Sequence, residues 1–396
     1  MVSAEHICNP VSTRELERRW QAVRAAMAER DIDVLLMQNA NSFHGGYVRW
    51  FTDSPAVNGG YAAVVFPRDD RMTTVRHGPP GESVVAADDP VHRGARKLLT
   101  APTFAAVDYK KTLAADLVLS DLRPRMPATV GLVGTASMAH PFLDGIRNGG
   151  LPGARFVDAT DLVDRLKALK SPEEIALIRQ TAAMQDAVME DVLQSVKPGK
   201  RNFELTALAQ FAGQNRGSEQ GIFLAGSQPL GCPNAYTVRH MQNRKIEAGD
   251  QFTLLIENNG PGGFYCELGR TCVLGKAPPE LLDEFEFTLE AQRFTLSLLE
   301  PGARPAEILA AYNDFMRGNG KPEERRLHAH GQGYDMVERP LICEEETMTL
   351  AATMSLAVHP GYEMGAINSW VSDNYLLTED GESERLHRTP QKIFEL

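Results

Sequence analysis

The chain has 396 residues, of which 41 are lysine or arginine and 52 are aspartate or glutamate, giving a formal net charge of −11. At about 100–200 residues per domain, this length predicts two or three domains. Hydrophobic residues make up 43% of the chain and charged residues 23%, as in ordinary soluble globular proteins. The acidic excess argues against a nucleic acid or an anionic membrane as the main partner.

The cysteines indicate a reducing compartment. They are odd in number, widely spaced and without a CxxC pair, which excludes a zinc ribbon and disfavours a disulfide framework. The N-terminal residues lack the apolar core of a secretory signal, and no apolar stretch approaches the roughly 20 residues of a membrane helix. We therefore expect a cytoplasmic protein. The five cysteines are Cys8, Cys232, Cys266, Cys272 and Cys343.

The first part of the chain alternates helix and strand signals. Apolar residues at helical spacing predict an amphipathic helix over residues 13–30. Short apolar runs at 34–37 and 61–66 then predict strands. The alternation continues to about residue 157 and is typical of an α/β domain. We assign residues 1–160 to this domain.

A strong helix start follows. Ser171 precedes Pro172, and Glu174 stands three residues after Ser171, which is the pattern of an N-cap with a capping box. A long helix is therefore predicted from Pro172, and the Lys-Pro-Gly sequence at 197–199 ends it.

The pattern then recurs weakly. A second long helical segment at 280–299 is followed by Glu-Pro-Gly at 300–302, and each long helix precedes a shorter helix and strands. The repeat predicts a second domain, residues 161–396, with two similar halves.

Residues 252–275 predict a β-hairpin, because apolar runs flank the glycine-rich turn at 260–263. Glu257 ends one strand and Glu267 lies inside the other. A glutamate in a strand core is costly unless it is paired, hydrogen-bonded or bound to a ligand. The structural alternative is an ion pair between Glu267 and Arg270. The turn is not a phosphate loop, because it lacks GKS/T and no helix follows it.

Two histidine-containing segments are further candidates. His328 and His330 are two residues apart, so in a strand they share one face and are expected to line one pocket. His359 follows the apolar run at 355–358, next to Pro360. A buried histidine there needs a partner. The structural alternative for a single histidine is a packed, non-catalytic role.

Together these motifs resemble the pita-bread family, which includes creatinase, prolidase, aminopeptidase P and methionine aminopeptidase. The resemblance covers residues 170–396, and residues 1–160 resemble the N-terminal domain of creatinase and aminopeptidase P. It implies an α+β protein: a creatinase-type α/β domain followed by a pita-bread domain with pseudo-duplicated halves. The matching motifs are Arg270-Thr271, His330-Gly331-x-Gly333, Pro360-Gly361 and Leu377-Thr378-Glu379-Asp380-Gly381.

The chain departs from this family at its metal ligands. The family's peptidases hold two metal ions with two aspartates, one histidine and two glutamates. The first aspartate falls on Ile256, or on Glu257 if the turn is one residue shorter. Because a dinuclear site needs several carboxylates, the sequence predicts no ordinary dinuclear peptidase and no metal cofactor. The other ligand positions fall on Glu267, His330, His359 and Ser372.

Creatinase is the family member that lacks metal and uses a histidine as general acid–base. The position of its catalytic histidine falls near Val238, and His240 stands two residues further on. The family's proton-shuttling histidine falls on Val337, next to Glu338. His240 and Glu338 are therefore additional catalytic candidates.

The resemblance favours a metal-independent hydrolase of a C–N bond, amide or amidine, in a small polar or zwitterionic metabolite. Glu257 and Glu267 would bind the positive end of the substrate, with Arg270 as a further binding candidate. His330 and His359 would supply general acid–base catalysis, with Glu267 beside them.

The resemblance also implies a homodimer in which the partner's N-terminal domain closes the pocket. Tyr47, Arg49 and Trp50 lie in the corresponding stretch and are substrate-binding candidates. Arg49 could hold a carboxylate bidentately. The structural alternative is a solvent-facing aromatic and arginine surface.

Two alternatives stay open. Glu267, His330 and His359 could hold a single divalent metal ion as a two-histidine, one-carboxylate set. Such a site would serve a hydrolase similar to Xaa-Pro peptidases, or a lyase similar to the pita-bread enzyme that cleaves dimethylsulfoniopropionate. The other alternative is a catalytically inactive scaffold that binds proteins. A pocket with two histidines and two glutamates argues for chemistry instead.

Overall fold

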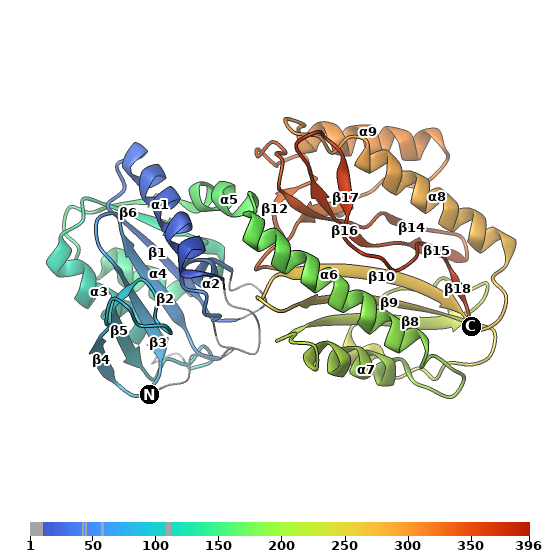
Figure 1. Ribbon diagram of the computed structural model, residues 1–396, viewed down its shortest axis with the longest axis horizontal. Helices are drawn as coiled ribbons and strands as arrows, with labels where there is room; N and C mark the ends of the chain where they lie inside the picture. Colours follow the sequence, from blue (N-terminus) through green and yellow to red (C-terminus); the bar gives the residue numbers. More distant parts are fainter. Residues whose placement is uncertain (1–10, 42, 44–45, 57–58, 108–111) are drawn as a thin grey trace. The chain divides into compact units, whose positions relative to one another are not determined.

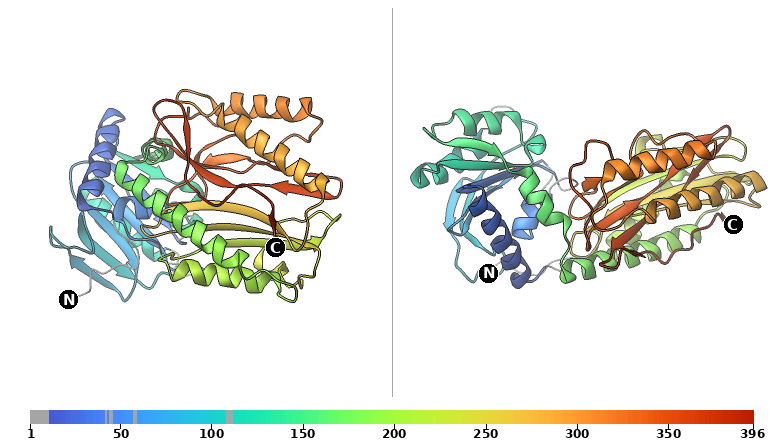
Figure 2. Two further views of the ribbon diagram at one scale, coloured as in Figure 1. Left: turned by 45° about the vertical axis from the view of Figure 1, so that its right-hand side comes forward. Right: turned by 90° about the horizontal axis from the view of Figure 1, so that it is seen from above.

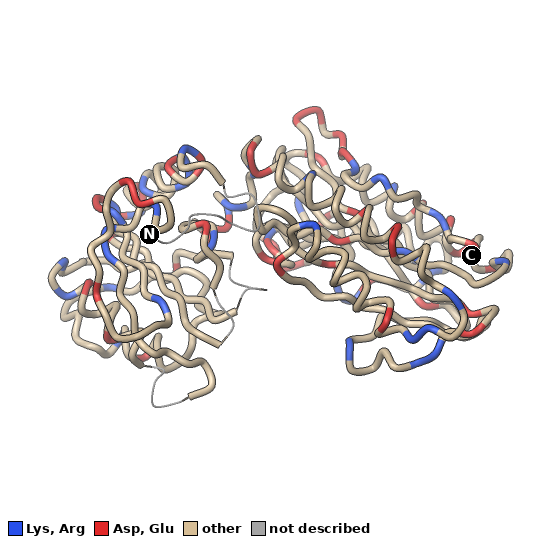
Figure 3. Tube along the Cα trace, turned by 60° about the horizontal axis from the view of Figure 1, so that its bottom comes forward, with Lys and Arg blue, Asp and Glu red and all other residues tan. Residues whose placement is uncertain are grey.

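A computed structural model describes residues 11–41, 43, 46–56, 59–107 and 112–396 (Figure 1). The chain divides into two compact units between Lys167 and Ala168. Figure 3 shows basic and acidic residues interspersed along the described trace of both units. Among the described residues, every helix is too short or too polar to cross a bilayer. Cys232, Cys266, Cys272 and Cys343 are free, and Cys8 lies outside the described residues.

The first unit is built on a seven-stranded mixed sheet with the strand order β4-β5-β3-β2-β1-β6-β7. All residues of its central strands β1 and β2 are buried, which is typical of strands covered on both faces. The predicted helix at 13–30 and both predicted strands are confirmed. The strands are β1 (Val34–Asn39), β2 (Ala62–Pro67), β3 (Met72–His77), β4 (Gly81–Val84), β5 (Ala95–Ala101), β6 (Thr129–Val133) and β7 (Arg155–Asp158). The helices are α1 (Thr13–Glu29), α2 (Gly46–Thr52), α3 (Leu113–Arg125), α4 (His140–Asn148) and α5 (Thr160–Ala168).

The second unit repeats one arrangement twice: two helices and then an antiparallel sheet. Figures 1 and 2 show α6 lying across the first sheet, and α8 and α9 side by side over the second. The first half contains α6 (Pro172–Leu193), α7 (Asn202–Gln214), β8 (Gly221–Pro229), η3 (Arg239–Met241), β9 (Asp250–Asn259) and β10 (Tyr265–Val273). The second half contains α8 (Pro279–Leu296), α9 (Pro305–Gly318), β11 (Ala329–Gly331), β12 (Glu338–Leu341), β13 (Ser355–Val358), β14 (Gly361–Met364), β15 (Ile367–Trp370), β16 (Asp373–Leu377) and β17 (Ser383–Arg385). The C-terminal strand β18 (Phe394–Glu395) pairs with β10 in the first sheet.

The start of α6 follows from its sequence. The Ser171 hydroxyl accepts a hydrogen bond from the Glu174 amide at 3.2 Å, and the Glu174 carboxylate accepts one from the Ser171 amide at 2.7 Å. Two amides that the helix itself cannot satisfy are thus bonded, and Pro172 occupies the first helical position. The predicted capping box is confirmed.

The register of the β9–β10 hairpin decides which residues face the interior of the pita-bread unit. Glu257 pairs directly with Glu267, and Ile256 pairs with Leu268. Because side chains alternate along a strand, the two glutamates share one face and the two apolar residues share the other. Ile256 and Leu268 pack in the core with residues of α6 and α7. Glu257, and not Ile256, is therefore the residue opposite Glu267.

The second sheet presents a matching face. His330, Ala357 and Asn374 are paired in register across β11, β13 and β16, so they share one face. Ala329 and Val358 point the other way, into the core that includes Ile308 of α9. His330 and Asn374 are thereby on the face opposite the core, where they meet the glutamates of the first sheet.

Arg270 lies on the core side of β10 and does not reach Glu267. Its Nη2 donates to Oδ1 of Asp373 at 2.7 Å, and its Nε donates to the carbonyl of Pro390 at 2.9 Å. Both members of this ion pair are buried. The prediction of Arg270 as a substrate-binding residue, and the alternative pairing with Glu267, are both wrong, because three residues along a strand reverse the direction of the side chain.

His328 also differs from its prediction. It stacks on Tyr312 of α9 with ring centroids 3.9 Å apart, and within the described chain neither ring nitrogen has a hydrogen-bond partner. It does not line a pocket with His330. Burial, together with a positive charge on nearby His359, lowers its pKa to about 3.

The Arg270→Met substitution tests the buried ion pair. It leaves the Asp373 carboxylate buried beside fewer donors, so we expect the free energy of unfolding to fall by about 3–5 kcal/mol in urea denaturation. Arg179→Met is the control, because the Arg179–Glu384 pair is exposed and contributes about 1 kcal/mol or less. Equal losses in the two variants would contradict this account.

The buried imidazole of His328 predicts a pH dependence of stability. Its pKa in the folded chain lies below the ordinary value of 6.5, so the unfolded chain binds the extra proton first as the pH falls. Stability is therefore retained above pH 6.5 and lost toward pH 3. Between pH 7 and 5 the wild type should lose about 2 kcal/mol more than His328→Phe. Urea titrations at both pH values measure this, with His140→Phe, on the exposed surface of α4, as the control. Parallel losses in wild type and His328→Phe would refute the assignment.

Candidate functional site

A cavity of about 430 Å³ opens in the second unit, and its four-stranded and five-stranded sheets both contribute to the lining. Glu257 and Glu267 come from the hairpin of the first sheet, and His330 comes from β11 of the second. His359 reaches the cavity from the residue directly after β13. The alternation of side chains along each strand thus brings four of the predicted site residues to one cavity.

Three of these residues converge most closely. Glu267, His330 and His359 each offer one ligand atom, and the three atoms lie within 4.8 Å of one another. His330 Nε2 is 3.9 Å from Oε2 of Glu267, and the two imidazole rings are 5.1 Å apart at an angle of 61°. Residues from two sheets and a strand end therefore form one cluster of potential metal ligands.

The backbone fixes the tautomer of neutral His330. Its Nδ1 lies 2.9 Å from the carbonyl oxygen of Gly331. A carbonyl only accepts hydrogen bonds, so Nδ1 carries the proton and Nε2 keeps its lone pair. Because Nε2 is the atom near Glu267, the lone pair is available to a cation or a proton inside the cavity.

A chain of hydrogen bonds connects the two glutamates. The backbone amide of Glu267 donates to Oδ1 of Asn374 at 2.6 Å, and Nδ2 of Asn374 donates to Oε1 of Gln332 at 2.7 Å. Gln332 in turn donates to Oε1 of Glu257 at 3.0 Å. Both amide side chains use their donor and their acceptor, so the position of the Glu257 carboxylate is coupled to that of β10.

The electrostatics of the cavity favour a positive ligand. Burial raises the pKa of both glutamates, and the negative charge of Glu267 raises that of Glu257 further. Burial also lowers the pKa of His330 and of His359 to about 4, so both imidazoles are neutral near pH 7. Arg326 also lines the cavity, but among the described residues no lysine or arginine is hydrogen-bonded or ion-paired to Glu257 or Glu267, so the two carboxylates favour a cationic ligand.

The donor set fits one divalent ion and not two. Two neutral imidazoles and one carboxylate form a recognised mononuclear set with open positions. Ser372, which the sequence places at the expected position of the family's last glutamate, supplies a hydroxyl and not a carboxylate, and that hydroxyl donates to Oε1 of Glu267 at 2.7 Å. Ile256 faces the core. A second dication would therefore lack the bridging carboxylates that it requires.

His240 and Glu338 do not join this cluster. His240 is exposed in η3 and is not part of the cavity lining. Oε2 of Glu338 accepts a hydrogen bond from Lys170 at 3.0 Å, and Oε1 accepts one from the amide of Asp335. Glu338 and Lys170 are both buried, so they form a structural ion pair. The structure gives neither residue the catalytic position that was predicted.

The predicted residues of the first unit lie on α2. The Tyr47 hydroxyl donates to Asp164 at 2.7 Å, and the Lys167 ammonium lies 4.4 Å from the centre of its ring. Arg49 and Trp50 are only 5% and 2% exposed, which excludes a solvent-facing arginine and tryptophan surface. A role for these residues toward a partner subunit, and the homodimer itself, stay predictions.

Sequence reasoning missed several residues that line the cavity or are hydrogen-bonded to its glutamates. Gln332 occupies the variable position of the His-Gly-x-Gly motif, which was the available signal. Arg326 lies at the cavity with its guanidinium carbon 4.9 Å from the centre of the Trp370 ring. Tyr236 and Asn374 carried no signal, because neither belongs to a motif with a defined chemical role.

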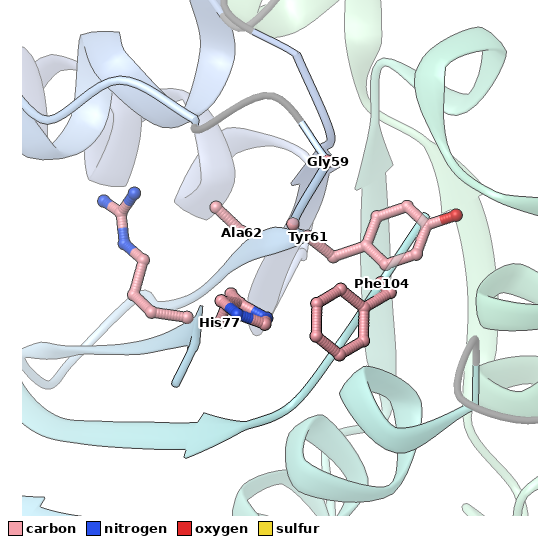
Figure 4. A pocket seen from close by; sticks show the side chains of 7 residues that line it. Gly59, Tyr61, Ala62, His77 and Phe104 are labelled. Carbon is pink, nitrogen blue, oxygen red and sulfur yellow. The ribbon is translucent and has the colours of Figure 1, made fainter. Parts of the chain in front are cut away.

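A second cavity, of about 280 Å³, lies in the first unit (Figure 4). His77 and Phe104 meet there edge to face with ring centroids 4.6 Å apart, and His77 Nδ1 donates to the carbonyl of Thr103 at 2.8 Å. The described residues that line it include no carboxylate or thiol. We therefore place the candidate active site in the second unit.

Comparison with solved structures shows the fold. A prolidase from Thermococcus sibiricus superposes with a TM-score of 0.77 and 16% identity, over 96% of this chain and 99% of that one. The dipeptidase PepE from Mycobacterium ulcerans gives a TM-score of 0.75 and 22% identity, over 98% and 99%. The predicted fold, a creatinase-type domain followed by a pita-bread domain, agrees with both.

Curated relatives match a little more than half of the chain. The protein named "Probable dipeptidase PepE" of Mycobacterium tuberculosis is 26% identical over 227 residues, 56% of this chain and 60% of that protein. This chain thus spans about three fifths of that relative. The Xaa-Pro dipeptidase of Pyrococcus furiosus is 23% identical, over 60% and 68% of the two chains. The ectoine hydrolase of Halomonas elongata is 26% identical, over 62% and 64%.

The family is shown by a match to a family sequence model. The sequence model of metallopeptidase family M24 matches residues 176–379, which is more than half of the chain. The matched region contains the β9–β10 hairpin and all three residues of the ligand cluster. The chain therefore belongs to metallopeptidase family M24.

Proposed function

We propose that this chain is a hydrolase that cleaves a C–N bond, amide or amidine, in a small cationic or zwitterionic metabolite. We further propose that Glu267, His330 and His359 hold a single divalent metal ion. The observation that carries the proposal is the convergence of these three side chains, with their ligand atoms within 4.8 Å of one another. The relatives support the reaction class, since they are named dipeptidases and an ectoine hydrolase.

Each residue has a distinct role in this scheme. A divalent ion in the cluster would supply a Lewis acid and a source of activated water. His330, whose Nδ1 is held by the carbonyl of Gly331, would offer the lone pair of Nε2 as a ligand. Glu257 lies outside the ligand cluster, and its carboxylate, fixed by Gln332, would bind the positive end of the substrate.

The shape and charge of the cavity support a small zwitterion. A volume of about 430 Å³ is near the lower end of ordinary ligand pockets. The carboxylates are buried, whereas the side chain of Arg326 is 65% exposed. A substrate with its cation against Glu257 and its carboxylate near Arg326 would match both charges. In this orientation, specificity would depend on the positive charge at one end of the substrate and on the negative charge at its other end.

A metal-independent, creatinase-like mechanism is the second candidate. The observation that favours it is the distance of 3.9 Å between His330 Nε2 and Oε2 of Glu267. It places an imidazole base beside a carboxylate. In that scheme His330 and His359 would transfer protons, and Glu257 with Glu267 would bind the substrate cation. A pKa of about 4 makes both histidines weak bases and leaves little imidazolium at neutral pH, so the metal scheme uses them better.

The metal site can be tested without a substrate. Protein stripped with a chelator should bind one Mn²⁺ or Zn²⁺ per chain in isothermal titration calorimetry. Glu267→Gln and His359→Ala each remove a ligand and should weaken binding about 100-fold or more. Glu257→Gln should change the affinity by less than about tenfold, because Glu257 is not in the ligand cluster. Absence of binding in the wild type would reject the metal scheme and leave the second candidate.

Substrate class can be tested with four probes: creatine, ectoine, an Xaa-Pro dipeptide and dimethylsulfoniopropionate. We expect hydrolysis of an amide or amidine probe, followed by mass spectrometry, and loss of that activity after chelation. Glu257→Gln should raise KM about tenfold or more with a smaller effect on kcat, since it removes a substrate contact.

Individual outcomes identify the reaction more closely. Preferred turnover of the dipeptide would narrow the proposed hydrolase to a peptidase, whereas elimination from dimethylsulfoniopropionate would make the chain a lyase. Turnover that survives chelation would support the creatinase-like scheme. Absence of turnover of all four compounds would contradict the proposed substrate class and favour a binding scaffold.

A further inference from the structure

Tyr236 places at the cavity a buried hydroxyl without a hydrogen-bond partner among the described residues. It follows β8 in the chain and lines the cavity that contains Glu257 and Glu267. Its hydroxyl oxygen is buried, and within the described chain it has no hydrogen-bond partner. A buried hydroxyl without a partner costs free energy, so a protein retains one only when something else requires it.

The surrounding residues leave room for this hydroxyl. A Cβ at Gly269 would stand 2.9 Å from the Tyr236 oxygen and 3.1 Å from Cβ of Ser372, so only glycine fits there without displacement. Gly269 is two residues from Glu267 and therefore shares its face of β10. The ring of Tyr236 meets Trp370 edge to face, with centroids 5.5 Å apart. The hydroxyl is thus held on the same face of β10 as Glu267.

The neighbours of the hydroxyl keep it a donor. Burial raises the pKa of Tyr236, and the negative charge of Glu267 raises it further, so the phenol stays protonated. The nearby Ser372 hydroxyl gives its own proton to Glu267. The Tyr236 hydroxyl is therefore a hydrogen-bond donor without an acceptor among the described residues. A ligand bound in the cavity could supply that acceptor.

We infer that Tyr236 donates a hydrogen bond to the substrate oxygen that becomes negatively charged during hydrolysis. This inference rests on the proposed function. When water adds to an amide carbon, the electron pair of the C=O π bond moves to the oxygen, and the Tyr236 hydroxyl stabilises that charge. The pair returns when the C–N bond breaks and the nitrogen leaves with a proton. The inference adds a substrate-contacting residue that belongs to no motif of the sequence.

A stability comparison tests the inference without a substrate. Tyr236→Phe removes only the hydroxyl, so its melting temperature should equal or exceed that of the wild type. Tyr375→Phe is the matched control, because the buried Tyr375 hydroxyl donates to Gln292 at 3.1 Å. The control should melt below the wild type. If Tyr236→Phe melts as low as Tyr375→Phe, the hydroxyl is structural and the inference is wrong.

Kinetics provide the second arm. For an amide probe that the wild type hydrolyses, in which the reacting carbon carries a C=O oxygen, Tyr236→Phe should lower kcat about 100-fold or more and change KM by only a few-fold. An unchanged kcat would overturn the inference even when the melting temperatures agree with it. If the wild type hydrolyses none of the four probes, the proposed function fails, and the melting temperatures alone still decide whether the hydroxyl has a structural role.

Discussion

The site depends on two buried carboxylates that face each other across one pair of strands. Glu257 and Glu267 are direct partners in the β9–β10 hairpin. Neither has a lysine or arginine partner among the hydrogen bonds and ion pairs of the described chain, since Glu257 bonds to Gln332 and Glu267 to Ser372. Because buried negative charge is costly without a counterion, the arrangement is most stable with a cation between or beside them. In the proposed function, the metal ion and the cationic substrate would both supply this positive charge.

The same hairpin keeps its own positive charge away from the cavity. Arg270 is three residues from Glu267 and points to the other face, where it binds Asp373. Lys170 is likewise paired with Glu338 outside the cavity lining. Arg270 and Lys170 thus each neutralise a structural carboxylate, and neither is paired with a glutamate of the cavity. The alternation of side chains along the strands separates structural charge from functional charge.

The sequence predicts features that depend on neighbouring residues. The hairpin turn, the capping box at Ser171 and the histidines at strand ends follow from local spacing and are found in the structure. The partner of Arg270 and the position of Asn374 depend on which strands of different sheets meet, and the bond from Glu267 to Asn374 spans 107 positions. Local periodicity predicts on which face of a strand a side chain lies, but it does not predict which other element packs against that face. His328 was assigned to the cavity for this reason, although Tyr312 of α9 covers it.

The central claim is that this member of family M24 has a site for one metal ion beside a carboxylate kept for the substrate. A crystal of the whole chain soaked in Mn²⁺, measured at a wavelength with strong anomalous scattering from manganese, tests it most directly. The account predicts a single anomalous peak among Glu267, His330 and His359, with the Glu257 carboxylate outside coordination distance. Two peaks, or a single peak bound through Glu257, would contradict it.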